Sequence, residues 1–311
     1  MTLKKTFLIP FVTASLVCLS SAKLVLADPL PSPRGAADLP VTTGLRVWLD
    51  GNDIDGDGVP ESAGEAGIVD GKVMTWVDKA TADGVQSASQ ANADYQPTLL
   101  GSPHAIRPVV HFDRVDDFMK TAAFEEAIDQ PMSVFTLFQL DDGVTLEENN
   151  YIIYDGLNGP GSRVLLVNEF LGGPEGGKLG FFTGSFVADN YVLWGTDRDG
   201  EPVVTTAEYN SPSSVLRLDG DIVMENKTTG ADILDGLTLG GRFAPCCDDE
   251  PRLTMNGYIG EVLVYDRLLA EGDRMAVESY LASKWLVPEP SGLAILMVAA
   301  LGLPLLRRRK P

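Results

Sequence analysis

The feature that most constrains this fold is a long succession of short apolar runs, separated by clusters of Gly, Pro, Asp and Asn. The runs are rich in β-branched and aromatic residues, which is typical of strands between turns. Strands do not alternate with helices, so a sandwich or jelly roll is favoured over a parallel sheet. The sequence predicts an all-β fold with strands at Leu45–Leu49, Val73–Val77, Pro108–Phe112, Met132–Leu140, Tyr151–Tyr154, Ser162–Val167, Lys178–Phe182, Tyr191–Trp194, Val203–Tyr209, Val215–Leu218, Ile222–Glu225 and Tyr258–Tyr265.

One helix is predicted after the last strand, from about Ala270 to Trp285. Val277, Tyr280, Leu281 and Trp285 recur at helical spacing and form one apolar stripe. We expect this amphipathic helix to bury the stripe against the sandwich. The tryptophans Trp48 and Trp76 lie in strands and are expected in the core.

The N-terminus has the features of a secretory signal peptide. Lys4 and Lys5 precede an apolar run, and small residues follow it, so cleavage is expected after Ala22 or Ala27. Residues 1–27 are therefore interpreted as a signal peptide. Residues 28–43 are interpreted as a leader or linker that proline stiffens.

The C-terminus, residues 287–311, has three parts in a fixed order. Pro288-Glu289-Pro290 comes first, then an apolar run from Gly292 to Leu306, then the basic residues Arg307, Arg308, Arg309 and Lys310. The run is about the shortest that spans a bilayer, and the basic cluster resists translocation. We predict a C-terminal membrane helix.

This order resembles a PEP-CTERM sorting signal. The resemblance implies processing near Pro288–Pro290 by an exosortase-type enzyme, and transient anchoring in the inner membrane. It also implies a final place at the cell surface or in the extracellular matrix. A plain membrane anchor is the alternative.

A second resemblance covers residues 44–286. It is carried by Gly44–Asp50, Val73–Lys79, Gln96–Thr98, Arg107–Asp113, Gly257–Arg267 and Val277–Trp285, in that order. This set resembles the LamG-like, concanavalin A-like jelly-roll domains of exported bacterial proteins. The resemblance implies a jelly-roll sandwich closed by a helix. It implies little about function, because such folds host lectins, adhesion modules, hydrolases and spacers.

The charge balance excludes one class of partner. The formal net charge is −20, and it becomes about −26 between the two terminal segments, which hold seven of the Lys and Arg residues and one Glu. Nucleic acid requires basic patches and is not an expected partner. Cys246 and Cys247 are adjacent, so they cannot bridge to each other without strain. Their role stays open.

A calcium loop is the one predicted metal site. Asp53, Asp55 and Asp57 stand at alternate positions with Gly56 and Gly58 between and after them, which suits an oxygen-ligated cation. The loop is not an EF-hand, because its twelfth position is Gly64. Glu61 or Glu65 is expected to complete it, and a solvated acidic turn is the alternative.

The enzyme hypothesis finds little support in the sequence. Related glycoside hydrolases carry Glu-x-Asp-x-x-Glu on one strand, and this pattern is absent. Glu261 and Asp266 point to opposite faces of the last strand. With only His104 and His111, a histidine-based triad is poorly supported. We therefore expect a non-enzymatic, exported protein that binds or structures extracellular polysaccharide. A matrix component without a specific ligand, or a glycoside hydrolase, are the alternatives.

Overall fold

The fold is described from a computed structural model. It describes residues 39–61, 66–81, 84–101, 107–141, 150–157, 164–168, 178–183, 190–193, 200–242 and 253–286. Backbone contacts divide the chain into Met1–Ser32 and Pro33–Pro311, and all described residues belong to the second unit. The predicted signal peptide and the predicted tail lie outside the described residues.

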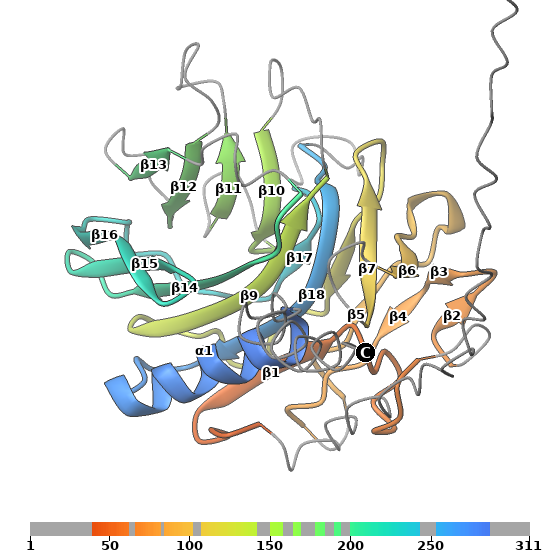
Figure 1. Cartoon of the computed structure of the whole chain (residues 1–311), viewed down its shortest axis with the longest axis horizontal. Coiled ribbons are helices and arrows are strands. Elements are labelled where there is room, and N and C mark those ends of the chain that lie inside the picture. The colour runs from red at the N-terminus through yellow and green to blue at the C-terminus, as the bar shows by residue number, and fades with distance from the viewer. Residues whose placement is uncertain are drawn as a thin grey trace, which may run out of the picture. The chain divides into compact units, whose positions relative to one another are not determined.

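Two antiparallel sheets form the body of the molecule (Figure 1). The larger sheet has the order β16 (Asp221–Lys227), β15 (Ser214–Leu218), β14 (Val203–Tyr209), β9 (Met132–Leu140), β18 (Asn256–Tyr265), β7 (Pro108–Asp113), β6 (Thr98–Gly101), β3 (Lys72–Val73) and β2 (Ile68–Val69), and β1 (Leu45–Asp50) pairs with β18. The smaller sheet has the order β13 (Tyr191–Leu193), β12 (Lys178–Phe182), β11 (Val164–Asn168), β10 (Asn150–Asp155), β17 (Thr238–Leu239), β8 (Met119–Thr121), β5 (Ala88–Ser89) and β4 (Thr75–Trp76).

The main core lies between the two sheets. Val110, Phe138 and Ile259 of the larger sheet meet Ile153 and Phe181 of the smaller sheet in one buried cluster. Alternate residues along each strand of the larger sheet therefore face the core, and the residues between them face outward. This alternation confirms the predicted β-sandwich class.

The single helix among the described residues, α1 (Glu271–Trp285), lies across the outer face of the larger sheet (Figure 1). Val277, Leu281 and Trp285 are fully buried, as the apolar stripe predicts, while Tyr280 is half-buried. They pack on outward residues of the strands, among them Phe135 and Leu263, and form a second core. The molecule thus has three layers, with the larger sheet in the middle.

The strand predictions hold for the long runs and fail for the short ones. The predicted strand at Val73–Val77 is wrong as one strand: it breaks at Met74, so that β3 joins the larger sheet and β4 the smaller. The short strands β2, β5, β6, β8 and β17 and the 3₁₀ turn η2 (Ala93–Tyr95) were not predicted. β15 and β16 are joined at Asp219-Gly220 by a tight hairpin turn, and both residues have the positive φ (53° and 88°) that such a two-residue turn requires.

The described residues contain no helix that is both long enough and apolar enough to cross a bilayer. The predicted membrane helix, Gly292–Leu306, lies outside them, so it stays a prediction.

Candidate functional site

The predicted calcium loop follows β1 directly and is tied to the sandwich by its backbone. The amide of Asp53 donates to the carbonyl of Asp50 (3.0 Å), and the amide of Glu61 donates to the carbonyl of Asn52 (3.0 Å). Between them, Ile54 is fully buried and its carbonyl accepts from the amide of Val77 (2.7 Å). The buried side chain of Ile54, the second residue of the loop, therefore fixes the positions of the neighbouring acidic side chains.

The loop brings two of the three predicted ligands together with Glu61, one of the two residues expected to complete the site. Asp53, Asp55 and Glu61 each offer a carboxylate oxygen, and these oxygens lie within 4.8 Å of one another. Asp57 is not a member of this group, and its Oδ1 accepts from the amide of Val59 (2.7 Å). Three converging carboxylates are a donor set for an oxygen-ligated cation. Glu65 lies outside the described residues.

A lysine already stands against this group, which the sequence analysis missed. The Lys79 ammonium binds Asp53 Oδ2 at 2.5 Å and Asp50 Oδ2 at 2.9 Å, and it lies 4.4 Å from the centre of the Trp48 ring. Burial acts to lower the pKa of Lys79, but the carboxylates of Asp50 and Asp53 outweigh it and raise that pKa. A calcium ion at Asp53 would therefore compete with a charged ammonium.

Asp50 connects the loop to a buried polar cluster under α1. Lys284, near the end of the helix, places its ammonium 2.7 Å from Asp50 Oδ1 and 2.7 Å from Glu261 Oε2. Burial acts to raise the pKa of Asp50, yet the ammonium groups of Lys284 and Lys79 hold that pKa below its usual value. Carboxylates and ammonium groups thus alternate from Asp53 through to Glu261.

Glu261 is the centre of this cluster. Its side chain has no exposed surface, and it accepts four hydrogen bonds. Oε1 accepts from the indole of Trp48 (2.7 Å) and the hydroxyl of Tyr280 (3.0 Å). Oε2 accepts from Lys284 (2.7 Å) and the indole of Trp285 (2.7 Å). Burial raises the pKa of Glu261, and the neighbouring ammonium opposes this. Glu261 therefore holds the helix to the sheet.

A second acidic group lies in the turn after β7. Asp113, Asp116 and Asp117 offer oxygens within 4.8 Å of one another. Burial and the charge of Asp113 raise the pKa of Asp117 to about 7, although the amide of Asp113, which donates to Asp117 Oδ2 (3.1 Å), acts to lower it. The adjacent acidic pair Asp116-Asp117 was visible in the sequence, but its burial was not.

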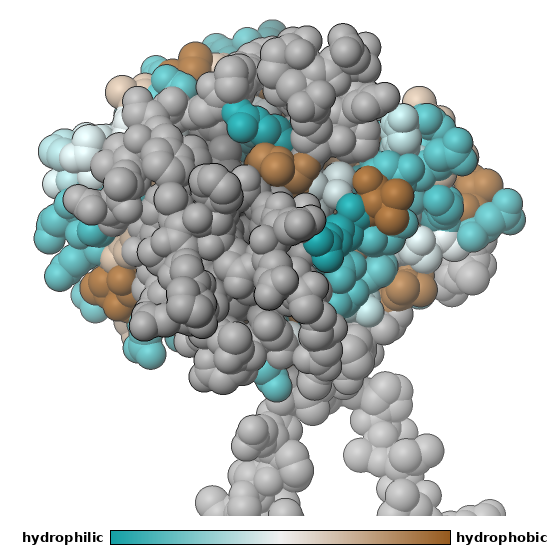
Figure 2. Space-filling model, turned by 90° about the horizontal axis from the view of Figure 1, so that it is seen from above, coloured by the Kyte–Doolittle hydropathy of each residue, from teal (hydrophilic) through white to brown (hydrophobic). Residues whose placement is uncertain are grey.

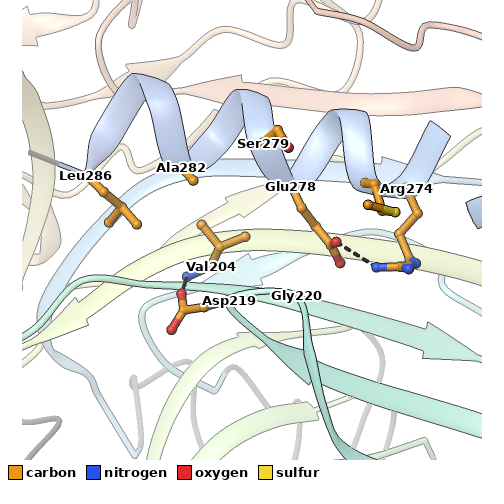
Figure 3. Close-up of a pocket in the computed structure, with 9 residues that line it drawn as sticks. Val204, Asp219, Gly220, Arg274, Glu278, Ser279, Ala282 and Leu286 are labelled. Atoms are coloured by element: carbon orange, nitrogen blue, oxygen red, sulfur yellow. Dashed lines mark hydrogen bonds and ion pairs between the residues drawn. The ribbon is translucent and has the colours of Figure 1, made fainter. Parts of the chain in front are cut away.

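A groove of about 440 Å³ runs between α1 and the turn that joins β15 and β16 (Figure 3). Arg274 and Glu278 of the helix project into it and form an ion pair at 2.6 Å. Glu278 also accepts from the hydroxyl of Thr206 (2.8 Å). Arg274 and Glu278 therefore pair with each other, and the third charged residue of the groove, Asp219, accepts from the amide of Val204 (3.0 Å).

Several predicted residues lie outside the described residues. They are the sorting residues Pro288, Glu289, Pro290, Arg307, Arg308 and Arg309, the cysteines Cys246 and Cys247, and Trp194 and His104. On the face seen in Figure 2, the hydrophobic residues that are coloured stand in small groups among hydrophilic ones. That face shows no broad apolar patch among its coloured residues.

Comparisons with known proteins show no family. No family model matches the chain, and no curated protein matches it. The solved structures that match include the sialidase of Trypanosoma rangeli in complex with sialic acid, with 15% identity over 78% of this chain and 33% of the sialidase, at a TM-score of 0.48. They also include the binding domain of botulinum neurotoxin serotype D, with 10% identity over 77% of this chain and 52% of that domain, at a TM-score of 0.47. The chain spans a third to a half of those lengths, and likenesses this weak carry no argument about function.

Proposed function

We propose that this chain is an exported, surface-sorted and non-enzymatic protein whose LamG-like jelly-roll domain binds extracellular polysaccharide. The alternatives are a matrix component without a specific ligand and, with less support, a glycoside hydrolase. The proposal combines the two sequence resemblances with the position of the residues that carry them.

The observation that carries the proposal is the convergence of the LamG-like motifs on Glu261. Trp48 comes from the first motif, and Glu261 from the last strand. Trp285 and Lys284 come from the closing helix, and all are joined by hydrogen bonds of 2.7 Å. Motif residues that meet in one buried cluster are structural residues, which supports a concanavalin A-like jelly roll closed by its helix.

The same cluster weighs against hydrolysis at this position. Asp50 and Glu261 stand opposite each other on β1 and β18, which superficially resembles a pair of catalytic carboxylates. Both are buried and both bind Lys284, so neither faces a space that a sugar could enter. A pair fixed in this way supports the non-enzymatic interpretation.

A glycan array probed with the full chain, with and without millimolar calcium, tests the proposal. Binding that is selective for a set of glycans, and absent after thermal unfolding of the same sample, is the expected result. If no glycan binds while the chain co-purifies with exopolysaccharide, the matrix alternative is correct. Release of reducing sugar from a bound polysaccharide would show a hydrolase.

Sorting to the surface is a separate part of the proposal and rests on the three-part tail. Pro288→Ala with Pro290→Ala should leave a membrane-bound precursor in a host that has an exosortase-type enzyme. Pro29→Ala with Pro31→Ala is the matched control, because it removes two prolines from the leader and should be processed normally. Normal processing of the tail variant would leave a plain anchor as the better explanation.

A further inference from the structure

A row of five outward-facing residues crosses the larger sheet. Thr98 on β6 is opposite His111 on β7, His111 is opposite Tyr258 on β18, and Tyr258 is opposite Gln139 on β9. Lys72 on β3 extends the row, since it is opposite Thr98. Neighbouring strands are about 4.8 Å apart, so this row of Lys72, Thr98, His111, Tyr258 and Gln139 is about 19 Å long.

The row lies on the face that α1 covers, but beyond the end of the helix. Phe112, Ile259 and Phe138 point into the main core, so the residues that alternate with them point outward. The next outward residues along the strands, Val109 and Leu137, belong to the core under the helix. The row therefore lies next to the part of this face that the helix covers. Lys72, Thr98, His111 and Tyr258 are half-buried, and Gln139 at the end of the row is buried.

The centre of the row is an aromatic pair with a carboxylate beside it. The rings of His111 and Tyr258 lie 4.6 Å apart, centre to centre, and are tilted by 50°. His111 Nε2 lies 3.1 Å from Asp141 Oδ2, at the end of β9. The side chains of His111 and Asp141 keep 17% and 28% of their surface exposed.

We propose that this row is the saccharide-binding surface, and that it takes a polysaccharide without acidic groups. This proposal rests on the proposed function and names the site at which it would act. The aromatic pair offers a surface for the C–H face of a sugar ring, where dispersion contacts accumulate. Thr98 and Asp141, on either side of the pair, offer a hydroxyl and a carboxylate to the hydroxyls of the sugar.

The surrounding charge selects against an acidic polysaccharide. Asp113 and Asp141 both stand at the edge of the row that faces away from the helix, and Asp113 is opposite Asn256. Lys72 is the one cation in the row, and it donates to the carbonyl of Ala93 (3.0 Å) at its far end. Uronates, sulfates or phosphates would meet carboxylates there, whereas neutral hydroxyls donate to carboxylates readily.

Affinity electrophoresis of the full chain tests the site, with gels that contain dextran, galactomannan, mixed-linkage β-glucan or alginate. We expect retardation by at least one of the three neutral polymers and none by alginate. His111→Ala and Tyr258→Ala should each weaken that retardation by about tenfold, the loss of one aromatic contact. Tyr258→Phe keeps the ring and should stay within about twofold.

Met275→Ala is the control variant, because Met275 is exposed in the groove beside α1. It should bind like the native chain. Melting curves establish that each variant is folded. Asp141→Asn should also bind more weakly, and it tests the site if an alanine variant does not fold.

Three results would overturn the site. Folded His111→Ala, Tyr258→Ala and Asp141→Asn variants that bind normally would place the ligand elsewhere while leaving the proposed function intact. Retardation by alginate alone would refute the class of ligand. Retardation by no polymer, together with an empty glycan array, would refute the proposed function and the site with it.

Discussion

Glu261→Gln is the substitution that most directly tests the buried cluster. The amide keeps one oxygen, which can still accept from Trp48 and Tyr280 on the Oε1 side. On the other side, an NH₂ group replaces the acceptor and faces two donors, the Lys284 ammonium and the Trp285 indole. Because both donors are buried, they cannot turn to water instead.

The magnitude follows from what those two donors lose. A buried donor without its acceptor costs about 1–3 kcal/mol, and breaking a buried charge pair costs about 3–5 kcal/mol. Lys284 keeps its ion pair with Asp50 at 2.7 Å, so the cost of one unpaired donor sets the lower bound and the cost of a broken ion pair sets the upper bound. The free energy of unfolding should fall by about 1–5 kcal/mol, and the melting temperature by about 2–20 °C.

Urea unfolding followed by tryptophan fluorescence is the assay, because Trp48 and Trp285 both touch Glu261. Glu225→Gln is the matched control: Glu225 is exposed on the edge strand β16, and its loss should stay within about 0.5 kcal/mol. A double-mutant cycle with Lys284→Met isolates the ion pair. If Glu261→Gln loses less than about 1 kcal/mol, the cluster does not hold the helix and the reasoning is refuted.

Three further predictions concern the helix, the acidic turn and the loop. Trp285→Ala should cost about 3–5 kcal/mol as a core truncation, with Met275→Ala as the exposed control, and an unchanged melting temperature would mean that α1 is not docked. Because burial and Asp113 raise the pKa of Asp117 from 3.8 to about 7, the folded state holds a proton that the unfolded state has lost. Stability should therefore fall as the pH rises from about 4 to about 7, by at most about 4 kcal/mol, and Asp117→Asn should flatten this dependence; a native curve that is already flat would contradict it. In millimolar calcium the chain should melt at a higher temperature than in chelator. The free energy of unfolding should rise by up to about 2.7 kcal/mol when calcium is in hundredfold excess over its dissociation constant. Asp55→Ala should abolish the difference while Asp57→Ala keeps it, and identical curves for the native chain would leave an ordinary acidic turn.

The sequence predicted those parts of the fold that local pattern determines. Long alternating runs such as Met132–Leu140 became strands at the predicted bounds, and the helical stripe placed α1 to within one residue. The short strands were missed because most of them have only two or three residues, too few for a readable period. The break at Met74 was not predicted, because the chain passes from one sheet to the other there. A run of apolar residues looks the same whether or not it changes sheets.

The predicted calcium loop shows that local sequence pattern also fails to determine which residues come together in a site. Spacing alone placed Asp53, Asp55 and Asp57 together, because alternate acidic positions with glycines for the turn are typical of a calcium loop. In the structure the Asp57 carboxylate accepts from the amide of Val59, and Glu61 stands in the group in place of Asp57. Lys79 belongs to a different segment, 26 residues from Asp53 in the sequence, and no local pattern predicts its contact with Asp53.

The chemistry of Glu261 depends on one extra residue in β18. Ile259 is opposite Phe138 and Glu261 is opposite Leu137, so Gly260 is an insertion that β9 does not match. Strict alternation would send Glu261 toward the main core, where an unpaired carboxylate is costly. The bulge turns it outward, toward the helix. Its glycine also leaves room there, because a Cβ at Gly260 would lie 2.5 Å from Leu137 Cδ2 and 3.3 Å from the Trp285 ring. A Gly-Glu pair that interrupts an apolar alternation, followed by a helix that ends in Lys-Trp, is therefore the sequence signal of this buried cluster.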